Sequence, residues 1–182
     1  MKLDTNKASF VTVNPCRLCT PLGASLAFRG IRNCMPIIHG SQGCATYIRR
    51  FLISHFREPM DIASSSFSEE TAIFGGERNL LDAFENVIRQ YSPEVIGIAT
   101  SCLTETIGDD VDKIIKTVQS RVPAKLVTVS TPSFKGSHCI GFHDTVTSLV
   151  KSACTKVSSE YGVFIAPPIL STSDLRYIKS LC

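Results

Sequence analysis

Apolar positions along the chain form two kinds of pattern, short continuous runs and helical stripes. Runs at residues 35–38, 95–99 and 125–129 predict buried strands. A stripe at Leu80, Phe84, Val87, Ile88 and Tyr91 lies on one helical face, and similar stripes begin at residues 111 and 142. Strand, loop and helix in repetition, with short connections, predict an α/β fold with a parallel, Rossmann-like sheet and right-handed crossovers.

The segments that follow the three predicted strands are the natural place for a ligand, because such sheets bind at the carboxyl ends of their strands. These segments are residues 39–44, 100–105 and 130–137, and the first two contain a cysteine. A further run at 163–165 predicts another strand, and Ser173 caps a last helix up to Leu181. We expect the front of something longer, with one domain over residues 1–160 and the start of the next over 161–182.

Composition narrows the function classes. The 182 residues are 43% hydrophobic and 19% charged, which excludes a disordered chain. The net charge of +3 is too small to indicate nucleic-acid binding. No apolar run approaches the roughly 20 residues of a membrane-spanning helix. The first ten residues lack the apolar core of a signal peptide, so we expect a cytoplasmic protein.

Eight cysteines are the most conspicuous chemical feature. A reducing cytoplasm disfavours disulfides, which leaves packed thiols, a redox pair or metal ligands. Cys16 and Cys19 form a C-x-x-C pair, yet no second pair completes a zinc site and no strong strand precedes it as in a thioredoxin motif. Cys19, Cys44 and Cys102 lie in glycine, proline or polar loops, and three such thiolates suit an iron–sulfur cluster. Inert packing is the alternative.

The other candidates have plainer interpretations. We expect Cys34, Cys139 and Cys154 to serve as small core side chains. His39, at a strand end, fits a hydrogen bond to the backbone as well as a metal or proton site. Asp109 and Asp110 fit ordinary capping of the helix that follows.

Several strings in order carry a resemblance. They are PLGA at 21–24, HGSQGC at 39–44, HFREP at 55–59, TAIFGG at 71–76, CLTETIGDD at 102–110 and TPSF at 131–134. Together they resemble the nitrogenase component 1 family, on its β-like side, over nearly the whole chain. The resemblance implies a subunit of three parallel-sheet α/β domains, of which the chain holds the first and one strand–helix unit of the second.

The resemblance also implies a cofactor and its ligands. In β subunits of the family, three cysteines bind an eight-iron P-cluster (8Fe–7S) at the interface with the α subunit. By motif these fall on Cys19, Cys44 and Cys102, and a serine that also ligates the cluster falls on Ser133. In the cofactor-assembly scaffold, a 4Fe–4S cluster occupies the matching interface, with Cys44 as the ligand from this side.

The resemblance implies an α-like partner in a heterotetramer, and an iron protein as reductase. The short arm before Pro21 and the string at 47–56 favour the iron–molybdenum cofactor biosynthesis scaffold. The full set of three cysteines and Ser133 favours the β subunit of nitrogen-fixing molybdenum–iron nitrogenase. Of the two we expect the scaffold subunit, with the β subunit as the alternative. A cluster-free remnant that acts as an interaction module is the competing, non-enzymatic class.

Overall fold

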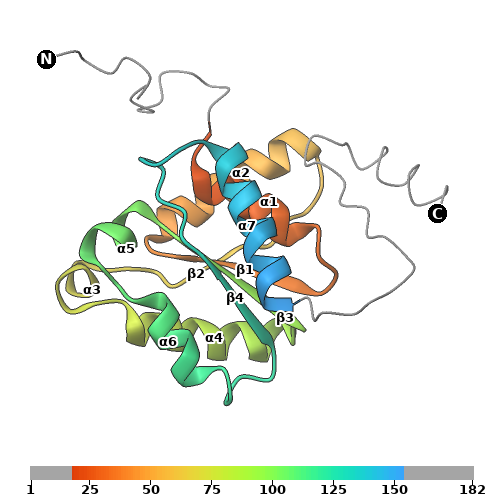
Figure 1. The fold of residues 1–182 in the computed structure, drawn as a ribbon. Helices are drawn as coiled ribbons and strands as arrows, with labels where there is room; N and C mark the ends of the chain where they lie inside the picture. Colours follow the sequence, from red (N-terminus) through yellow and green to blue (C-terminus); the bar gives the residue numbers. More distant parts are fainter. Residues whose placement is uncertain (1–17, 154–182) are drawn as a thin grey trace, which may run out of the picture.

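The computed structural model describes residues 18–153, which form a sheet with helices on both of its faces (Figure 1). The first half holds α1 (Thr20–Arg29), β1 (Cys34–His39), α2 (Gln42–Phe56), β2 (Ala63–Ser64), α3 (Glu69–Phe74) and α4 (Glu77–Tyr91). The second half holds β3 (Val95–Thr100), α5 (Cys102–Ile107), α6 (Val111–Val118), β4 (Lys125–Val129) and α7 (His138–Ala153).

The four strands of the described part are all parallel and lie in the order β2-β1-β3-β4. β1 pairs with β3 along its whole length, from Cys34 opposite Val95 to His39 opposite Thr100. The predicted parallel α/β fold is therefore confirmed. β1 and β3 are the central strands, so the segments that follow them leave the sheet side by side.

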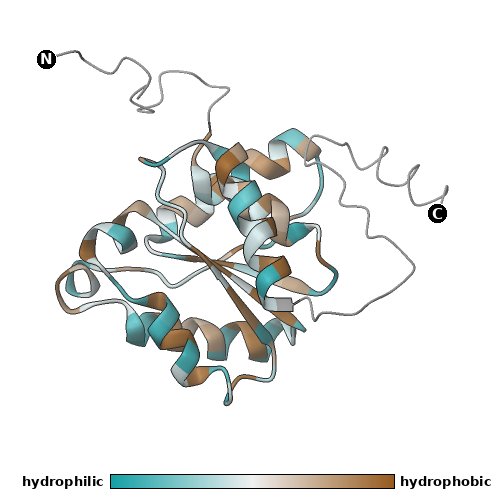
Figure 2. Cartoon of the chain, in the orientation of Figure 1, coloured by the Kyte–Doolittle hydropathy of each residue, from teal (hydrophilic) through white to brown (hydrophobic). Residues whose placement is uncertain are grey.

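The sheet separates two apolar layers. On one face, Leu80 and Phe84 of α4 and Ile114 of α6 pack against Ile37, Ile96 and Ile98. On the other face, Leu22 and Phe28 of α1 and Ile48 of α2 pack against Ile38, Ala99 and Val127. Figure 2 shows the central strands in brown, as expected for strands that are buried on both faces.

Two helices on the second face approach each other through glycines. A Cβ added at Gly23 of α1 would lie 1.8 Å from the carbonyl oxygen of His138, and one at Gly141 of α7 would lie 2.0 Å from that of Thr20. Only glycine permits this spacing, which brings the beginnings of α1 and α7 together.

Some local predictions were wrong. Cys102 was expected to lie in a loop and is the first residue of α5, while the two-residue β2 was not predicted. α3 begins with a capping box formed by Ser68 and Thr71, which was not predicted. The predicted strand at 163–165, the last helix and the domain boundary at 160 lie outside the described residues. Within residues 18–153, no helix is both long and apolar enough to cross a membrane.

Candidate functional site at the carboxyl edge of the sheet

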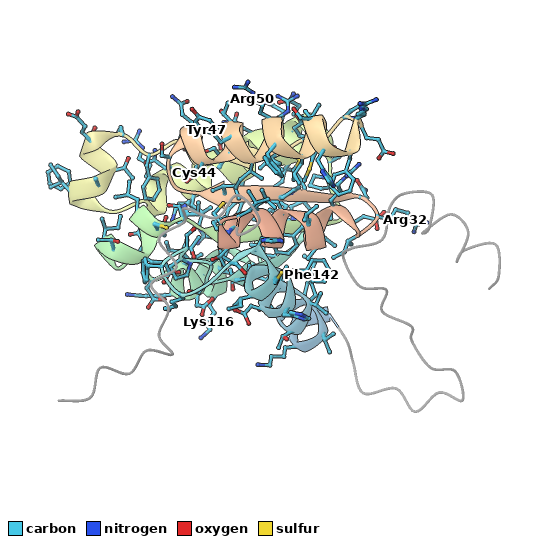
Figure 3. All side chains as sticks on the ribbon, turned by 90° about the horizontal axis from the view of Figure 1, so that it is seen from above. Arg32, Cys44, Tyr47, Arg50, Lys116 and Phe142 are labelled. Atoms are coloured by element: carbon cyan, nitrogen blue, oxygen red, sulfur yellow. The ribbon has the colours of Figure 1, made fainter. Side chains whose placement is uncertain are left out.

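The three predicted cluster cysteines each lie at the beginning of a helix. Cys19 is the N-cap of α1, Cys44 is the third residue of α2, and Cys102 is the first residue of α5. α2 and α5 follow the neighbouring strands β1 and β3, whose carboxyl ends meet at one edge. Figure 3 shows Cys44 at the start of α2, with Tyr47 and Arg50 on the outward side of that helix.

The structure brings the three sulfur atoms together. Burial raises the pKa of the Cys19 thiol, the backbone amide of Leu22 lowers it, and the thiolates of Cys44 and Cys102 raise it further. Desolvation of the Cys44 sulfur raises its pKa, and the Cys102 thiolate adds to that shift. Mutual repulsion between thiolates requires short separations. The raised pKa values keep the Cys19 and Cys44 thiols protonated at neutral pH, and a metal ion or cluster beside them would favour their thiolate forms.

The loop between β4 and α7 covers one side of this group. The backbone amide of Ser133 donates a hydrogen bond to the sulfur of Cys102, at 3.2 Å. The loop is also anchored at Thr131. Its amide donates a hydrogen bond to the Thr100 hydroxyl at 2.8 Å, and its hydroxyl donates one to the Thr100 carbonyl at 2.6 Å. The structure therefore places Ser133 beside Cys102, among the residues that the motifs single out.

Cys19 is held at the same edge by contacts on both of its sides. The Thr20 hydroxyl donates to the carbonyl of Gly136 at 3.0 Å. The amide of His138 donates to the carbonyl of Leu18 at 2.8 Å. These bonds tie the residues around Cys19 to the loop that carries Ser133.

Glu105 is a member of this edge that the sequence did not reveal. Its carboxylate accepts hydrogen bonds from the hydroxyls of Thr100, the last residue of β3, and Ser130, which directly follows β4. Glu105 lies three residues after Cys102, and this spacing indicates a shared face only when α5 is known to be a helix. Glu105 thus clamps the two strand ends between which Cys102 lies.

The remaining cysteines divide differently. Cys34 begins β1, at the opposite edge of the sheet, where burial raises the pKa of its thiol to about 12. Cys139 is exposed in the first turn of α7, so the prediction that it packs in the core was wrong. Cys16, Cys154 and Cys182 lie outside the described residues.

The donor set fits an iron–sulfur cluster better than a single ion. In the described part of the chain, no three His, Cys, Asp or Glu side chains lie close enough to hold one metal ion. A cluster spreads its thiolates further apart than one tetrahedral ion does, and it prefers sulfur donors. Backbone amides that face two of the sulfurs, those of Leu22 and Ser133, match the hydrogen bonding that tunes such clusters.

Exposed apolar side chains lie next to the candidate ligands. Tyr47, one turn after Cys44, is 72% exposed, and Phe134, beside Ser133, is 61% exposed. Leu103 follows Cys102 directly and is also exposed. Large apolar side chains gathered around a polar centre are typical of a surface that a partner covers.

Comparisons with known proteins identify the family of the chain. The family model for nitrogenase component 1 type oxidoreductases matches residues 19–182. A nitrogenase molybdenum–iron protein beta chain of Methanothermobacter thermautotrophicus is 37% identical over 94% of this chain and 39% of its own length. The iron–molybdenum cofactor biosynthesis protein NifN of a Nostoc species is also 37% identical, over all of this chain and 42% of its own.

A solved structure of the nitrogenase Cp1 matches with a TM-score of 0.82 and 35% identity, over 99% of this chain and 40% of that one. The chain thus spans about 40% of the length of these relatives and corresponds to their N-terminal part. The fold, the extent of the family match and these relatives lead to one conclusion: the chain belongs to the nitrogenase component 1 type oxidoreductase family.

Proposed function

We propose that the chain is a nitrogen-fixation subunit that holds an iron–sulfur cluster at an interface with an α-like partner subunit. The observation that carries the proposal is the convergence of Cys19, Cys44 and Cys102 at the start of three helices. Burial and neighbouring cysteines raise the pKa of Cys19 and Cys44, and cluster iron would supply the positive charge that favours their thiolate forms. When bound, the cluster supplies electron transfer.

The residues of this chain have distinct tasks in the proposal. Cys19, Cys44 and Cys102 are the thiolate ligands. The Ser133 amide hydrogen bonds to the Cys102 sulfur, and its hydroxyl is a further candidate ligand. Glu105 fixes the strand ends around them. The α-like partner supplies the remaining ligands and covers Tyr47 and Phe134, and an iron protein serves as reductase.

Two roles within the family fit this site. The presence of all three cysteines and Ser133 at the same edge supports the molybdenum–iron protein β subunit, since a P-cluster needs several ligands from this side. The second candidate is the cofactor biosynthesis scaffold, favoured by the string at 47–56 and by the NifN relative that matches the whole chain. The scaffold role needs only Cys44 from this side and a 4Fe–4S cluster.

The test is the iron content of the purified complex after anaerobic co-expression with the α-like subunit. Cys44→Ala is expected to remove the interface cluster, while Cys139→Ala, at an exposed thiol, serves as the matched control. Loss of iron in Cys19→Ala and Cys102→Ala as well supports the β-subunit role. Retention of iron in those two variants supports the scaffold role. Unchanged iron in all three variants overturns the proposal.

A further inference from the structure

His39 makes contacts that neither the motifs nor the proposed ligand set explains. It is the last residue of β1 and has no exposed surface. Its Nδ1 lies 2.9 Å from the hydroxyl oxygen of Ser65, and its Nε2 lies 3.4 Å from a carboxylate oxygen of Asp109. The ring of Phe67 packs edge-on against the imidazole at 4.8 Å. The sequence left two interpretations of this side chain open, a hydrogen bond to the backbone and a metal or proton site.

The hydrogen-bond network defines the tautomer of His39. The Ser65 oxygen already accepts the amide proton of Gly40 at 2.9 Å, so its own proton is available for Nδ1. The ring proton then lies on Nε2, whose 3.4 Å contact with the Asp109 carboxylate is electrostatic and not a well-formed hydrogen bond. Asp109 also accepts the amide of Gly76 at 2.8 Å. Burial lowers the pKa of His39 to about 4, against the opposing effect of Asp109, so the imidazole is neutral at physiological pH.

The backbone carbonyl of His39 accepts hydrogen bonds from residues at the beginning of α5. It accepts hydrogen bonds from the amide of Ser101 at 2.9 Å and from the hydroxyl of Thr104. Ser101 is the N-cap of α5, and Asp109 lies two residues beyond its end. One residue therefore holds α5 at both ends, by its carbonyl at the start and by its imidazole at the end.

This arrangement links the two cysteines that follow the central strands. Cys102 is the first residue of α5, and the strand that His39 ends leads into α2 and Cys44. We propose that His39 is a positioning residue whose imidazole, through Asp109, fixes the placement of Cys102 relative to Cys44. Its importance for a cluster rests on the proposed function, but the placement itself does not require metal.

A hydrolytic Ser-His-Asp site is a poor alternative. Ser65 is buried, and its oxygen is occupied by the Gly40 amide. Its hydroxyl bonds to Nδ1 while the carboxylate lies at Nε2, the reverse of the order that orients a catalytic histidine.

The test measures the proximity of the two thiols in the purified, metal-free protein. Dibromobimane becomes fluorescent when both of its arms have reacted with thiols, and peptide mass analysis identifies the pair that it bridges. His39→Phe keeps a ring of similar size, His39→Asn keeps an amide near Nδ1, and His39→Gln keeps one near Nε2. His55→Phe, at an exposed histidine of α2, is the matched control.

Bridging of Cys44 to Cys102 is expected to fall about tenfold in His39→Phe and His39→Asn, since the rate of such reactions depends steeply on placement. His39→Gln should restore most of it, and His55→Phe should leave it unchanged. Equal bridging in the wild type and in a folded His39→Phe overturns the proposal, because the ring then acts by packing alone.

If His39→Phe does not fold, Asp109→Ala removes the acceptor and leaves the histidine in place. The same loss of bridging supports the proposal, and unchanged bridging overturns it. The proposed function is tested separately by iron content. If the His39 variants lose bridging as expected but the complex binds no iron, the cluster proposal is contradicted and the positioning role is not. If the complex binds iron but the His39 variants bridge as well as the wild type, the positioning role is contradicted and the cluster proposal is not.

Discussion

The backbone amide of Ser133 donates a hydrogen bond to the sulfur of Cys102 across 3.2 Å. Because this contact uses the amide and not the hydroxyl, the roles of the two groups can be tested separately. Ser133→Ala keeps the amide, while Ser133→Pro removes it. Hydrogen bonds to cluster sulfur raise the reduction potential, so we expect the potential of the bound cluster to fall in Ser133→Pro. Redox titration of the anaerobic complex measures the change.

Ser133→Ala serves as the comparison in that titration. If the hydroxyl ligates the oxidised cluster, this variant changes the spectrum of the oxidised state and leaves the reduced state as it is. Identical potentials in Ser133→Pro and the wild type would contradict a role for the amide.

Because His39 is buried as a neutral imidazole, we expect the free energy of unfolding to decrease in mild acid. Its pKa is lowered from 6.5 to about 4 by burial, so the unfolded chain takes up a proton at a higher pH than the folded one. Its contribution to stability is complete above pH 6.5 and is lost as the pH falls to about 4, by about 3 kcal/mol. Asp109 is the charged group in contact with it.

Urea unfolding at a series of pH values measures this effect. His39→Gln lacks the titrating group, so its stability is expected to vary less with pH over that window. Parallel pH profiles for His39→Gln and the wild type would show that another group is responsible.

Gly97 lies in the central strand β3, where a Cβ would come within 2.3 Å of the Phe28 ring. Gly97→Ala is expected to destabilise the fold by about 1–3 kcal/mol, because it overpacks a closed core. Adding Phe28→Leu should recover part of that loss, since the two sites share one space. Denaturant unfolding provides the measurement.

Gly30→Ala is the control for that experiment. Gly30 has a helical backbone conformation, and its nearest neighbour would lie 3.3 Å from the added carbon. We expect a change within about 0.5 kcal/mol, as for most exposed sites. A Gly97→Ala variant as stable as Gly30→Ala would contradict the close approach of α1 to the sheet.

The close approach of α7 to α1 at Gly141 leads us to expect that the packing of these helices controls the reactivity of Cys19. A Cβ added at Gly141 would lie 2.0 Å from the Thr20 carbonyl oxygen, so Gly141→Ala pushes the start of α1 away from α7. Alkylation of Cys19 is expected to become faster, together with a lower melting temperature. Thr147→Ala, on the exposed side of the same helix, should change neither. Unaltered Cys19 alkylation in Gly141→Ala would argue against this coupling.

The exposed aromatic side chains at the site predict where a partner binds. Phe134→Ser and Tyr47→Ser are expected to weaken binding of the α-like subunit by about 30-fold, in line with about 2 kcal/mol for an interface anchor. Val150→Ser changes an exposed apolar residue near the other end of α7 and should leave the affinity as it is. Equal affinities in all three variants would exclude this edge as the interface.

The fold was predictable from the sequence because its strands are apolar on both faces. The apolar runs at 95–99 and 125–129 are sufficient by themselves to predict β3 and β4. β2 was missed because two residues, Ala63 and Ser64, carry no periodicity. α5 was missed because its six residues include two threonines and directly follow a strand, so propensity gave no helix signal.

The site was only partly predictable. Motifs located Cys19, Cys44 and Cys102, since cysteine in a glycine or polar loop is itself a chemical signal. Glu105 left no such trace. His39 and Asp109 were noted singly but not as a pair, because residues distant in sequence and ordinary in composition give no sign of their contact. Contacts of that kind are created by sheet topology and not by local pattern.

The pairing of β1 with β3 has a consequence for the order of events during biogenesis. The two strands are separated by about 60 residues of intervening chain, and such parallel, non-local pairings form late. Until they form, Cys44 and Cys102 belong to independent parts of a nascent polypeptide. If the proposed cluster is bound, its iron and sulfide can be delivered only after synthesis passes α5 and the two central strands join. A chaperone that delays collapse would then delay binding of that cluster equally.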